Sequence, residues 1–320
     1  MTLVVGNRPC AGGQTLSGLA LLRKPEGITS FQALYPIKRS LASGKVGHTG
    51  TLDRFAHGLL VILTGSYSRL SPYVMYGEKL YRGLIAFGTE TDTLDPEGSV
   101  IAVAPPPTRQ NLEEALPAFR GPILQRPPAY SAVHIGGKRA YQLALEGKEP
   151  ALKERRVNII SLELLSYEGV EALVEVRCSS GTYIRSLARD IAAACGSRAH
   201  LRALERLSIG PFHVKDAVSP EAFDPEVDLL AFSREHASAL GLRTIALVDS
   251  GLKSRFCNGG KIDPEAFSVS DGGPSAIGSE AAVFDQSGKL LGLISLETSG
   301  PKYKVVMPLS DGCVFTERSL

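Results

Sequence analysis

The segment at residues 47–60 reads GHTGTLDRFAHGLL and places one carboxylate, Asp53, behind a run of small and hydroxylated residues. The residues that follow, 59–63, are all apolar and are expected to form a buried strand. Because glycine lets a backbone approach a ligand closely, this arrangement suits an enzyme with a carboxylate nucleophile. An ordinary turn around Asp53 would have a similar composition, since Asp and Gly are common loop residues.

Further motifs follow one another along residues 17–213. They are KPEGITS at 24–30, KLYR at 79–82, GTETDT at 88–93 with DPEG at 95–98, PPAYSA at 127–132 with GKRAY at 137–141, CSSGTYIR at 178–185, and AHL at 199–201 with GPF at 210–212. With the Asp53 segment, this series resembles the tRNA pseudouridine-55 synthase family of the TruB type, in its bacterial stand-alone form. One such block can arise by chance, but an ordered series of six is far more specific.

The resemblance implies an α+β fold. We expect a catalytic domain with a mixed, mainly antiparallel sheet and flanking helices, followed by a small β-rich, PUA-like C-terminal domain. The expected division is a leader at 1–17, the catalytic domain at 18–241 with an RNA-binding insert at about 125–156, and the C-terminal domain at 242–320. The length of 320 residues agrees with two domains.

Several elements can be predicted from local patterns. The helix predicted at 183–194 places Ile184, Leu187 and Ile191 on one face, and Gly196 is expected to end it. Thr108 is a suitable N-cap for a helix at 109–119. The other predictions are strands at 19–22, 59–63, 81–87, 157–165 and 172–178, helices at 30–41 and 140–146, and a hairpin of 281–284 with 290–295.

Pseudouridine formation breaks the N1–C1′ bond of a uridine, turns the base and rejoins it through C5. The resemblance makes Asp53 the nucleophile, Arg185 its ion-pair partner and Tyr81 the aromatic residue that stacks on the flipped base. A nearby cation favours the charged form of a carboxylate, and a base inside a stem-loop must leave its stack to be reached. Taken alone, Arg185 could instead be a solvent-facing helix residue and Tyr81 a core residue.

The same resemblance suggests five residues that bind the substrate. Tyr183 and Leu204 match positions that line the uracil pocket, although core packing is the strong alternative for Leu204. His48 matches a histidine that fills the place of the everted nucleotides. Lys138 and Arg139 lie in the basic insert and could contact RNA phosphates, although a charged insert can equally be solvated surface.

No cofactor or metal is expected, because the reaction needs neither. The five cysteines are scattered without a CxxC pair, which argues against a disulfide framework and against a zinc site. The sequence contains no run of 18 apolar residues and its start does not have the pattern of a secretory signal. We therefore expect a cytoplasmic protein without a membrane partner. A monomer is also expected, although nothing in the residues fixes the oligomeric state.

Charge is divided unevenly along the chain. Residues 1–210 contain 25 Lys and Arg against 18 Asp and Glu, a balance of +7, whereas residues 211–320 contain 10 against 15, a balance of −5. A basic larger part suits a polyanionic partner, since cations on phosphates supply most non-specific affinity for nucleic acids. By resemblance, that partner is the T-arm stem-loop of tRNA, and no guide RNA is expected.

Three residues depart from the family pattern. Arg54 stands where the family usually carries Pro, His57 where it carries Thr, and Leu145 where it places Arg. Loss of the proline frees the backbone after Asp53, which could loosen the loop. Arg54 could also contact a phosphate directly.

Three alternatives to a stand-alone isomerase remain. One is an RNA-binding protein of the same fold that has lost activity, which the changes at Arg54 and His57 would motivate. Another is a nucleoside hydrolase with a single conspicuous carboxylate, and the last is a guide-RNA-dependent synthase. Incubating the purified protein with an unmodified T-arm hairpin, without other RNA or protein, separates these four functions.

Overall fold

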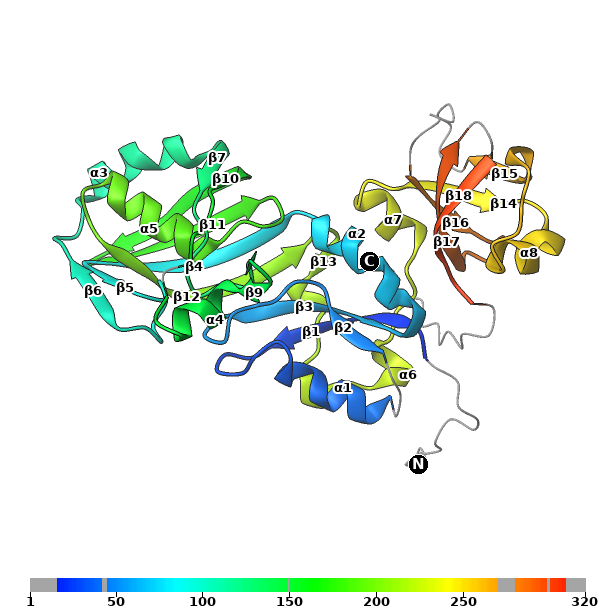
Figure 1. Ribbon diagram of the computed structural model, residues 1–320, viewed down its shortest axis with the longest axis horizontal. Coiled ribbons are helices and arrows are strands. Elements are labelled where there is room, and N and C mark those ends of the chain that lie inside the picture. Colours follow the sequence, from blue (N-terminus) through cyan, green and yellow to red (C-terminus); the bar gives the residue numbers. More distant parts are fainter. Residues whose placement is uncertain (1–15, 42–44, 149, 270–279, 298–299, 309–320) are drawn as a thin grey trace, which may run out of the picture.

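The computed structural model describes residues 16–41, 45–148, 150–269, 280–297 and 300–308. The larger part of the chain is built around a nine-stranded sheet, and a smaller β-rich part follows it (Figure 1). The order along the main sheet is β1 (Gly18–Lys24), β3 (His57–Thr64), β12 (Ala199–Ile209), β4 (Lys79–Phe87), β11 (Glu171–Cys178), β10 (Arg155–Glu168) and β7 (Gly121–Gln125). Short strands β2 (Val46–His48) and β13 (Phe212–His213) extend it on β3 and β12.

Every pairing in this sheet is antiparallel except that of β12 with β3. This parallel contact is short, pairing Glu205 with His57 and Arg206 with Gly58. It joins the strand after the Asp53 loop to the centre of the sheet. The α+β fold with a mixed, mainly antiparallel sheet is thereby confirmed.

The helices are short, apart from α5 (Ile184–Ala194), whose apolar side packs on the sheet with Leu187, Ala188 and Ile191 in the core. It ends as predicted, because Gly196 adopts φ +68° just after the C-cap. The others are α1 (Tyr35–Ser40), α2 (Ser71–Tyr76), α3 (Arg109–Ala115), α4 (Ala140–Leu145), α6 (Pro225–Asp228), α7 (Arg234–Ala239) and α8 (Lys253–Cys257).

The prediction of one continuous helix at 30–41 is wrong. Residues 32–34 form a 3-10 turn, and α1 starts only at Tyr35, with Pro36 in its first turn. Proline lacks an N–H, so it cannot continue the hydrogen-bond ladder but fits a first helical turn. The Thr29 hydroxyl accepts a hydrogen bond from the Gln32 N–H at 3.1 Å, but the N-cap of the 3-10 turn is Phe31, whose side chain caps nothing.

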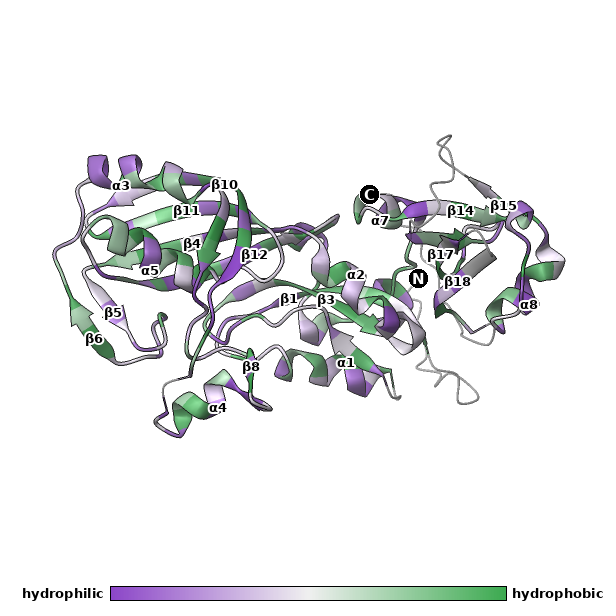
Figure 2. Ribbon diagram, turned by 45° about the horizontal axis from the view of Figure 1, so that its top comes forward, coloured by the Kyte–Doolittle hydropathy of each residue, from purple (hydrophilic) through white to green (hydrophobic). Residues whose placement is uncertain are grey.

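The segment between β7 and β10 leaves the sheet as an arm (Figure 2). It contains the small hairpin of β8 (His134–Ile135) and β9 (Lys138–Arg139), followed by α4. A second hairpin, β5 (Thr89–Thr91) with β6 (Val100–Val103), follows β4. The helical turn predicted at 140–146 matches α4 closely.

The smaller part has a five-stranded sheet in the order β15 (Phe267–Val269), β14 (Arg243–Leu247), β16 (Glu280–Phe284), β17 (Leu290–Glu297) and β18 (Gly300–Val306). The hairpin predicted at 281–295 corresponds to β16 and β17. The small β-rich unit expected at the C-terminal end is thus present. Part of its sheet shares a core with the larger part, since Ala282, Phe284 and Leu290 pack in one cluster with Tyr67 and Phe212.

No helix in the described residues is long and apolar enough to cross a membrane.

Candidate active site

The Asp53 loop is held on one side by the segment that reads KPEGITS. The Ser30 hydroxyl donates to the Leu52 carbonyl at 2.9 Å and accepts from the Leu52 N–H at 2.8 Å. The Gly27 N–H donates to the Arg54 carbonyl at 2.9 Å, and the Arg54 Nε donates back to the Gly27 carbonyl at the same distance. Both neighbours of Asp53 are therefore fixed, which restricts where its carboxylate can lie.

Lys24 adds a third connection from the same segment. Its side chain is buried and its Nζ donates to the carbonyls of Pro25, Ile28 and Arg54 at 2.8, 2.7 and 3.3 Å. Burial lowers the pKa of Lys24 to about 8, and the negative charge of Asp53 opposes this shift. The ammonium thus stabilises both the loop and the charge beside it.

Arg206 holds the loop from the other side. This arginine on β12 is almost fully buried, and it donates from Nε to the Leu59 carbonyl at 2.8 Å and from Nη2 to the Gly50 carbonyl at 3.1 Å. Gly58 makes this approach possible: it adopts φ +108°, and a Cβ there would lie 2.5 Å from the Arg206 carbonyl oxygen. Sequence reasoning did not identify Arg206.

Arg185 meets Asp53 as expected. Its Nε lies 2.8 Å from the Asp53 Oδ2, in an ion pair whose geometry is not that of a hydrogen bond. Only 5% of the Arg185 side chain is exposed, against 36% of the Asp53 side chain. The carboxylate therefore faces solvent from one side, where a substrate can reach it, while its cation is enclosed.

A second carboxylate, Asp95, holds the other end of Arg185. The Arg185 Nη1 lies 3.1 Å from the Asp95 Oδ2 and donates to the Thr93 carbonyl at 2.7 Å, and Nη2 donates to the Tyr130 carbonyl at 3.1 Å. Asp95 is buried, and its Oδ1 accepts from the Thr93 hydroxyl at 2.6 Å and the Glu97 N–H at 3.1 Å. Asp95 lies in the DPEG motif but was not among the residues predicted for the site.

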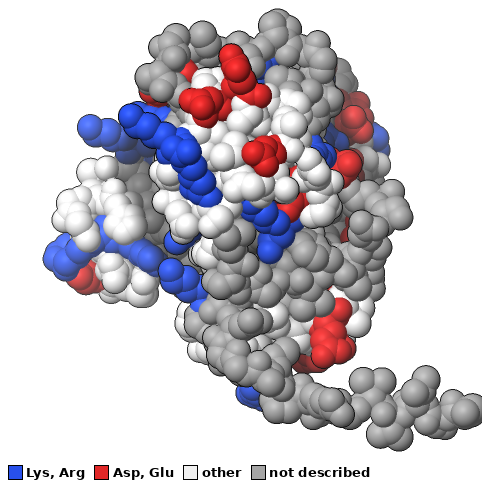
Figure 3. All heavy atoms as spheres, turned by 90° about the vertical axis from the view of Figure 1, so that its right-hand side faces the viewer, with Lys and Arg blue, Asp and Glu red and all other residues white. Residues whose placement is uncertain are grey.

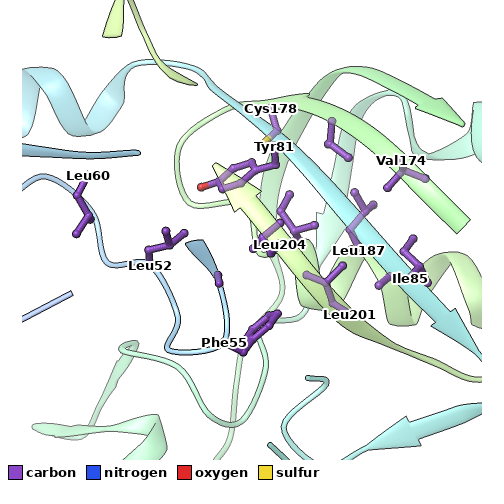
Figure 4. Packing of buried hydrophobic residues seen from close by; sticks show 14 of the residues in the cluster. Leu52, Phe55, Leu60, Tyr81, Ile85, Val174, Cys178, Leu187, Leu201 and Leu204 are labelled. Atoms are coloured by element: carbon purple, nitrogen blue, oxygen red, sulfur yellow. The ribbon is translucent and has the colours of Figure 1, made fainter. Parts of the chain in front are cut away.

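Tyr81 and Leu204 lie together in the core beside the loop. They come from the neighbouring strands β4 and β12, and Figure 4 shows the Tyr81 hydroxyl pointing away from the β4 strand with Leu204 beside the ring. Only 8% of Tyr81 and 5% of Leu204 is exposed. Burial raises the pKa of Tyr81, so its hydroxyl stays protonated.

Tyr183 and His48 flank the site from two other elements. Tyr183 precedes α5, and its backbone N–H and carbonyl both bond to the Gln125 side chain, at 2.8 and 3.1 Å. The guanidinium carbon of Arg155 lies 4.5 Å from the centre of its ring. His48 lies on β2, where burial and the charge of Arg206 lower its pKa.

Lys138 and Arg139 stand apart, on the arm that Figure 2 shows. The Lys138 Nζ lies 2.8 Å from one carboxylate oxygen of Glu146, and the Lys148 Nζ lies 2.8 Å from the other. Hydrogen bonds from these lysines lower the pKa of Glu146 to about 2. This exposed cluster carries one net positive charge, and an RNA phosphate would have to share Lys138 with Glu146.

On the end of the molecule that Figure 3 presents, charged side chains of both signs are scattered among uncharged ones, and the most prominent Lys and Arg side chains extend from the left of the view. Among the described residues, no three His, Cys, Asp or Glu side chains form a group that could hold a metal ion. The site itself combines one accessible carboxylate, a buried cation and a buried aromatic ring. Such a set can perform nucleophilic chemistry on a base that enters from solvent.

Comparison with known proteins identifies the family of the chain. Residues 38–184 match the model of the TruB family pseudouridylate synthase N-terminal domain. A protein of Treponema denticola, tRNA pseudouridine synthase B, is 40% identical over 260 residues, which cover 75% of this chain and 71% of the relative. The protein of the same name from Bordetella avium is 45% identical over 236 residues, 71% of this chain and 97% of the relative.

Solved structures show the same fold. A crystal structure of a Cbf5-Nop10-Gar1 complex matches 92% of this chain and 86% of its own, with a TM-score of 0.66 and 23% identity. A structure of an H/ACA RNP bound to a substrate RNA matches 93% of this chain and 88% of its own, with a TM-score of 0.64 and 20% identity. Fold, site and relatives define an RNA-modifying isomerase. The chain belongs to the TruB family of pseudouridylate synthases.

Proposed function

We propose that this protein converts uridine 55 in the T-arm of tRNA to pseudouridine, as a monomer in the cytoplasm and without a guide RNA. The observation that carries this proposal is the pairing of the accessible Asp53 with the buried Arg185. In the reaction the N1–C1′ bond breaks, a C5–C1′ bond forms, C5 loses a proton to solvent and N1 gains one. The overall change is an isomerisation, so no oxidant, reductant or metal enters the balance.

Asp53 is the proposed nucleophile, and Arg185 keeps it ionised and oriented. Asp95 and two backbone carbonyls hold the Arg185 guanidinium. It therefore cannot easily turn toward solvent or rotate away from Asp53. Orientation fixed before the substrate binds lowers the barrier of the chemical step. Tyr81 is the proposed stacking surface for the flipped uracil, with Tyr183 and Leu204 lining its pocket.

RNA binding is assigned to three further residues. His48 is proposed to fill the space that the everted nucleotides leave, and its lowered pKa keeps it neutral near pH 7, so it would act by shape rather than by charge. Lys138 and Arg139 are proposed to contact phosphates from the arm. Their exposed place on the arm suits binding of the stem, which proteins recognise mainly by shape and backbone.

The substitution Asp53→Asn tests the function. It keeps the size of the side chain but removes the nucleophile, so it should abolish pseudouridine formation while T-arm binding stays within about tenfold. Product formation and filter binding on one preparation, with purified protein and an unmodified hairpin, give both values. Substantial turnover by the variant would show that Asp53 is not the nucleophile.

We also propose that the chemistry lies within residues 18–241 and that residues 242–320 add affinity for full-length tRNA. The apolar cluster across the boundary, which contains Phe212, Phe232 and Phe284, would be exposed in a fragment ending near Arg243. Such a fragment should still convert a T-arm hairpin, with weaker apparent affinity for full-length tRNA. A soluble, folded fragment without turnover at saturating RNA would contradict this division.

A further inference from the structure

Arg206 lies where two strand pairings of β12 meet. On one side of the strand it pairs with Tyr81 of β4, and on the other side it pairs with Gly58 of β3. Strands β1, β2 and β3 join the rest of the main sheet through this pairing of β3 with β12. Arg206 therefore connects the strand that follows the Asp53 loop with the strand that carries Tyr81.

The side chain of Arg206 makes the same connection. Residues directly opposite each other on antiparallel strands project from the same face of the sheet, so the side chains of Arg206 and Tyr81 emerge side by side. Burial raises the pKa of Tyr81, whereas the charge of Arg206 and a hydrogen bond between the two side chains oppose this rise. In Figure 4 the Tyr81 hydroxyl points toward the side of the view on which Leu52 of the loop lies.

Three further hydrogen bonds of the guanidinium go to the Asp53 loop. Nε donates to the Leu59 carbonyl at 2.8 Å, Nη2 to the Gly50 carbonyl at 3.1 Å and Nη1 to the Thr51 carbonyl at 3.5 Å. Only 2% of the arginine is exposed, and these acceptors are neutral oxygens. Because a buried cation is stable only when its N–H groups are satisfied, the guanidinium constrains both the loop carbonyls and the Tyr81 hydroxyl.

We propose that Arg206 is a positioning residue that sets the place of the Asp53 carboxylate relative to the Tyr81 ring. A guanidinium has five N–H donors in fixed directions, so one side chain can hold the loop and the hydroxyl together. Arg206 is too deeply buried to touch RNA and acts through these two residues. A small misplacement of reacting groups slows a reaction strongly. The inference rests on the proposed function, because it concerns the geometry of the same reaction.

Hydrogen–deuterium exchange of the loop tests this link without turnover. Tyr81→Phe keeps the ring and removes the hydroxyl, so the backbone amides of residues 49–60 should exchange faster by about threefold or more, although the substitution lies on another strand. The control is Arg202→Met, which removes an exposed arginine of β12 that pairs with Glu171. It should leave exchange of this peptide unchanged. Unchanged exchange in Tyr81→Phe would overturn the proposal.

A double-mutant cycle on the chemical step tests the positioning role. Arg206→Lys keeps the charge but loses the fork, so single turnover at saturating T-arm hairpin should slow by about tenfold or more. Hairpin affinity should change by less than about threefold, because the effect does not pass through an RNA contact. Tyr81→Phe should also slow the step, and the double variant should be about as slow as the slower single variant, because both changes break one link. Arg202→Met should react like the wild type.

The outcomes separate this proposal from its rivals. A wild-type rate in a folded Arg206→Lys variant would overturn it. Effects that multiply in the double variant would also overturn it, because the Tyr81 hydroxyl would then act independently of Arg206. Thermal melting checks folding, and if Arg206→Lys does not fold, loop exchange in Tyr81→Phe decides, since that variant keeps the arginine. Faster loop exchange in Tyr81→Phe together with no turnover by the wild type would refute the proposed function and leave the link standing.

Discussion

Replacing Asp95 by Asn tests whether the buried half of the arginine network controls the reaction. The Asp95 Oδ2 lies 3.1 Å from the Arg185 Nη1, and the carboxylate is buried too deeply to touch RNA. An asparagine can still accept the hydrogen bonds of Thr93 and the Glu97 N–H with its oxygen. Its amide then points N–H groups at the guanidinium, so the main change is the loss of an acceptor and a charge.

The expected cost follows from what Arg185 retains. Breaking a buried ion pair costs about 3–5 kcal/mol when the remaining charged group has no other partner. Here Arg185 keeps Asp53 and the two carbonyls, so we expect about 2 kcal/mol, in the range of one charged hydrogen bond. If the whole of this free-energy cost raises the barrier of the chemical step, turnover falls roughly thirtyfold. If the cost instead lowers the free energy of unfolding, the melting temperature falls by about 4–8 °C.

Single-turnover measurement at saturating RNA separates the two effects, with melting and filter binding on the same sample. RNA affinity should change less than about threefold, because the effect passes through Arg185 and not through an RNA contact. Glu97→Gln is the matched control, because it removes a carboxylate from the same turn. The Glu97 side chain is exposed, and its ion-pair partner is the Arg54 Nε, 3.7 Å away, rather than Arg185. Wild-type turnover by a folded Asp95→Asn variant would refute the positioning role.

Three other predictions follow. Arg185→Met should lower turnover severely while the affinity for a T-arm hairpin stays close to that of the wild type, and a wild-type rate would exclude the ion pair with Asp53 from the mechanism. Replacing Lys138 and Arg139 together by Gln should reduce the magnitude of the salt slope of RNA binding by about one or two units, whereas an unchanged slope places the RNA elsewhere. The folded-state pKa of His48 is lowered, so the unfolded chain binds the extra proton first and stability falls as pH drops below about 6.5. Between neutral and mildly acidic pH, the melting temperature of the His48→Gln variant should therefore fall less than that of the wild type. An equal fall in both proteins would count against a lowered pKa of His48 in the folded state.

Local patterns in the sequence were sufficient for much of the fold. Helix α5 and the β16–β17 hairpin follow from apolar spacing and from turn residues, and Thr108 caps α3 as predicted by accepting from the Asn111 N–H at 3.2 Å. The central strand β12 was not predicted. Its sequence, AHLRALERLSI, contains charged residues that hide the alternation, and one of them, Arg206, is a buried residue that a sequence alone assigns to the surface.

The active site was harder to predict from residues alone. Asp53 and Arg185 lie far apart in the sequence, so no spacing rule pairs them, and the expectation came from resemblance to a family. Asp95 was missed because a DPEG stretch predicts a turn equally well whether or not its carboxylate is buried. Arg206 was missed because its function is to hold carbonyls of the loop, and backbone acceptors leave no trace in the sequence.

The change at Arg54 shows why a loop can accept a departure beside its nucleophile. The backbone carbonyl of Arg54 receives hydrogen bonds from Gly27 and Lys24, and a proline carbonyl could receive the same ones, so these anchors do not depend on the side chain. The side chain then adds its own hydrogen bond to the Gly27 carbonyl, which offsets the rigidity that a proline ring would supply. Because the Arg54 Nε already donates to this carbonyl, an RNA phosphate could be bound only by the two Nη atoms of Arg54. The structure therefore favours a loop that is tightened by different means over one that is loosened.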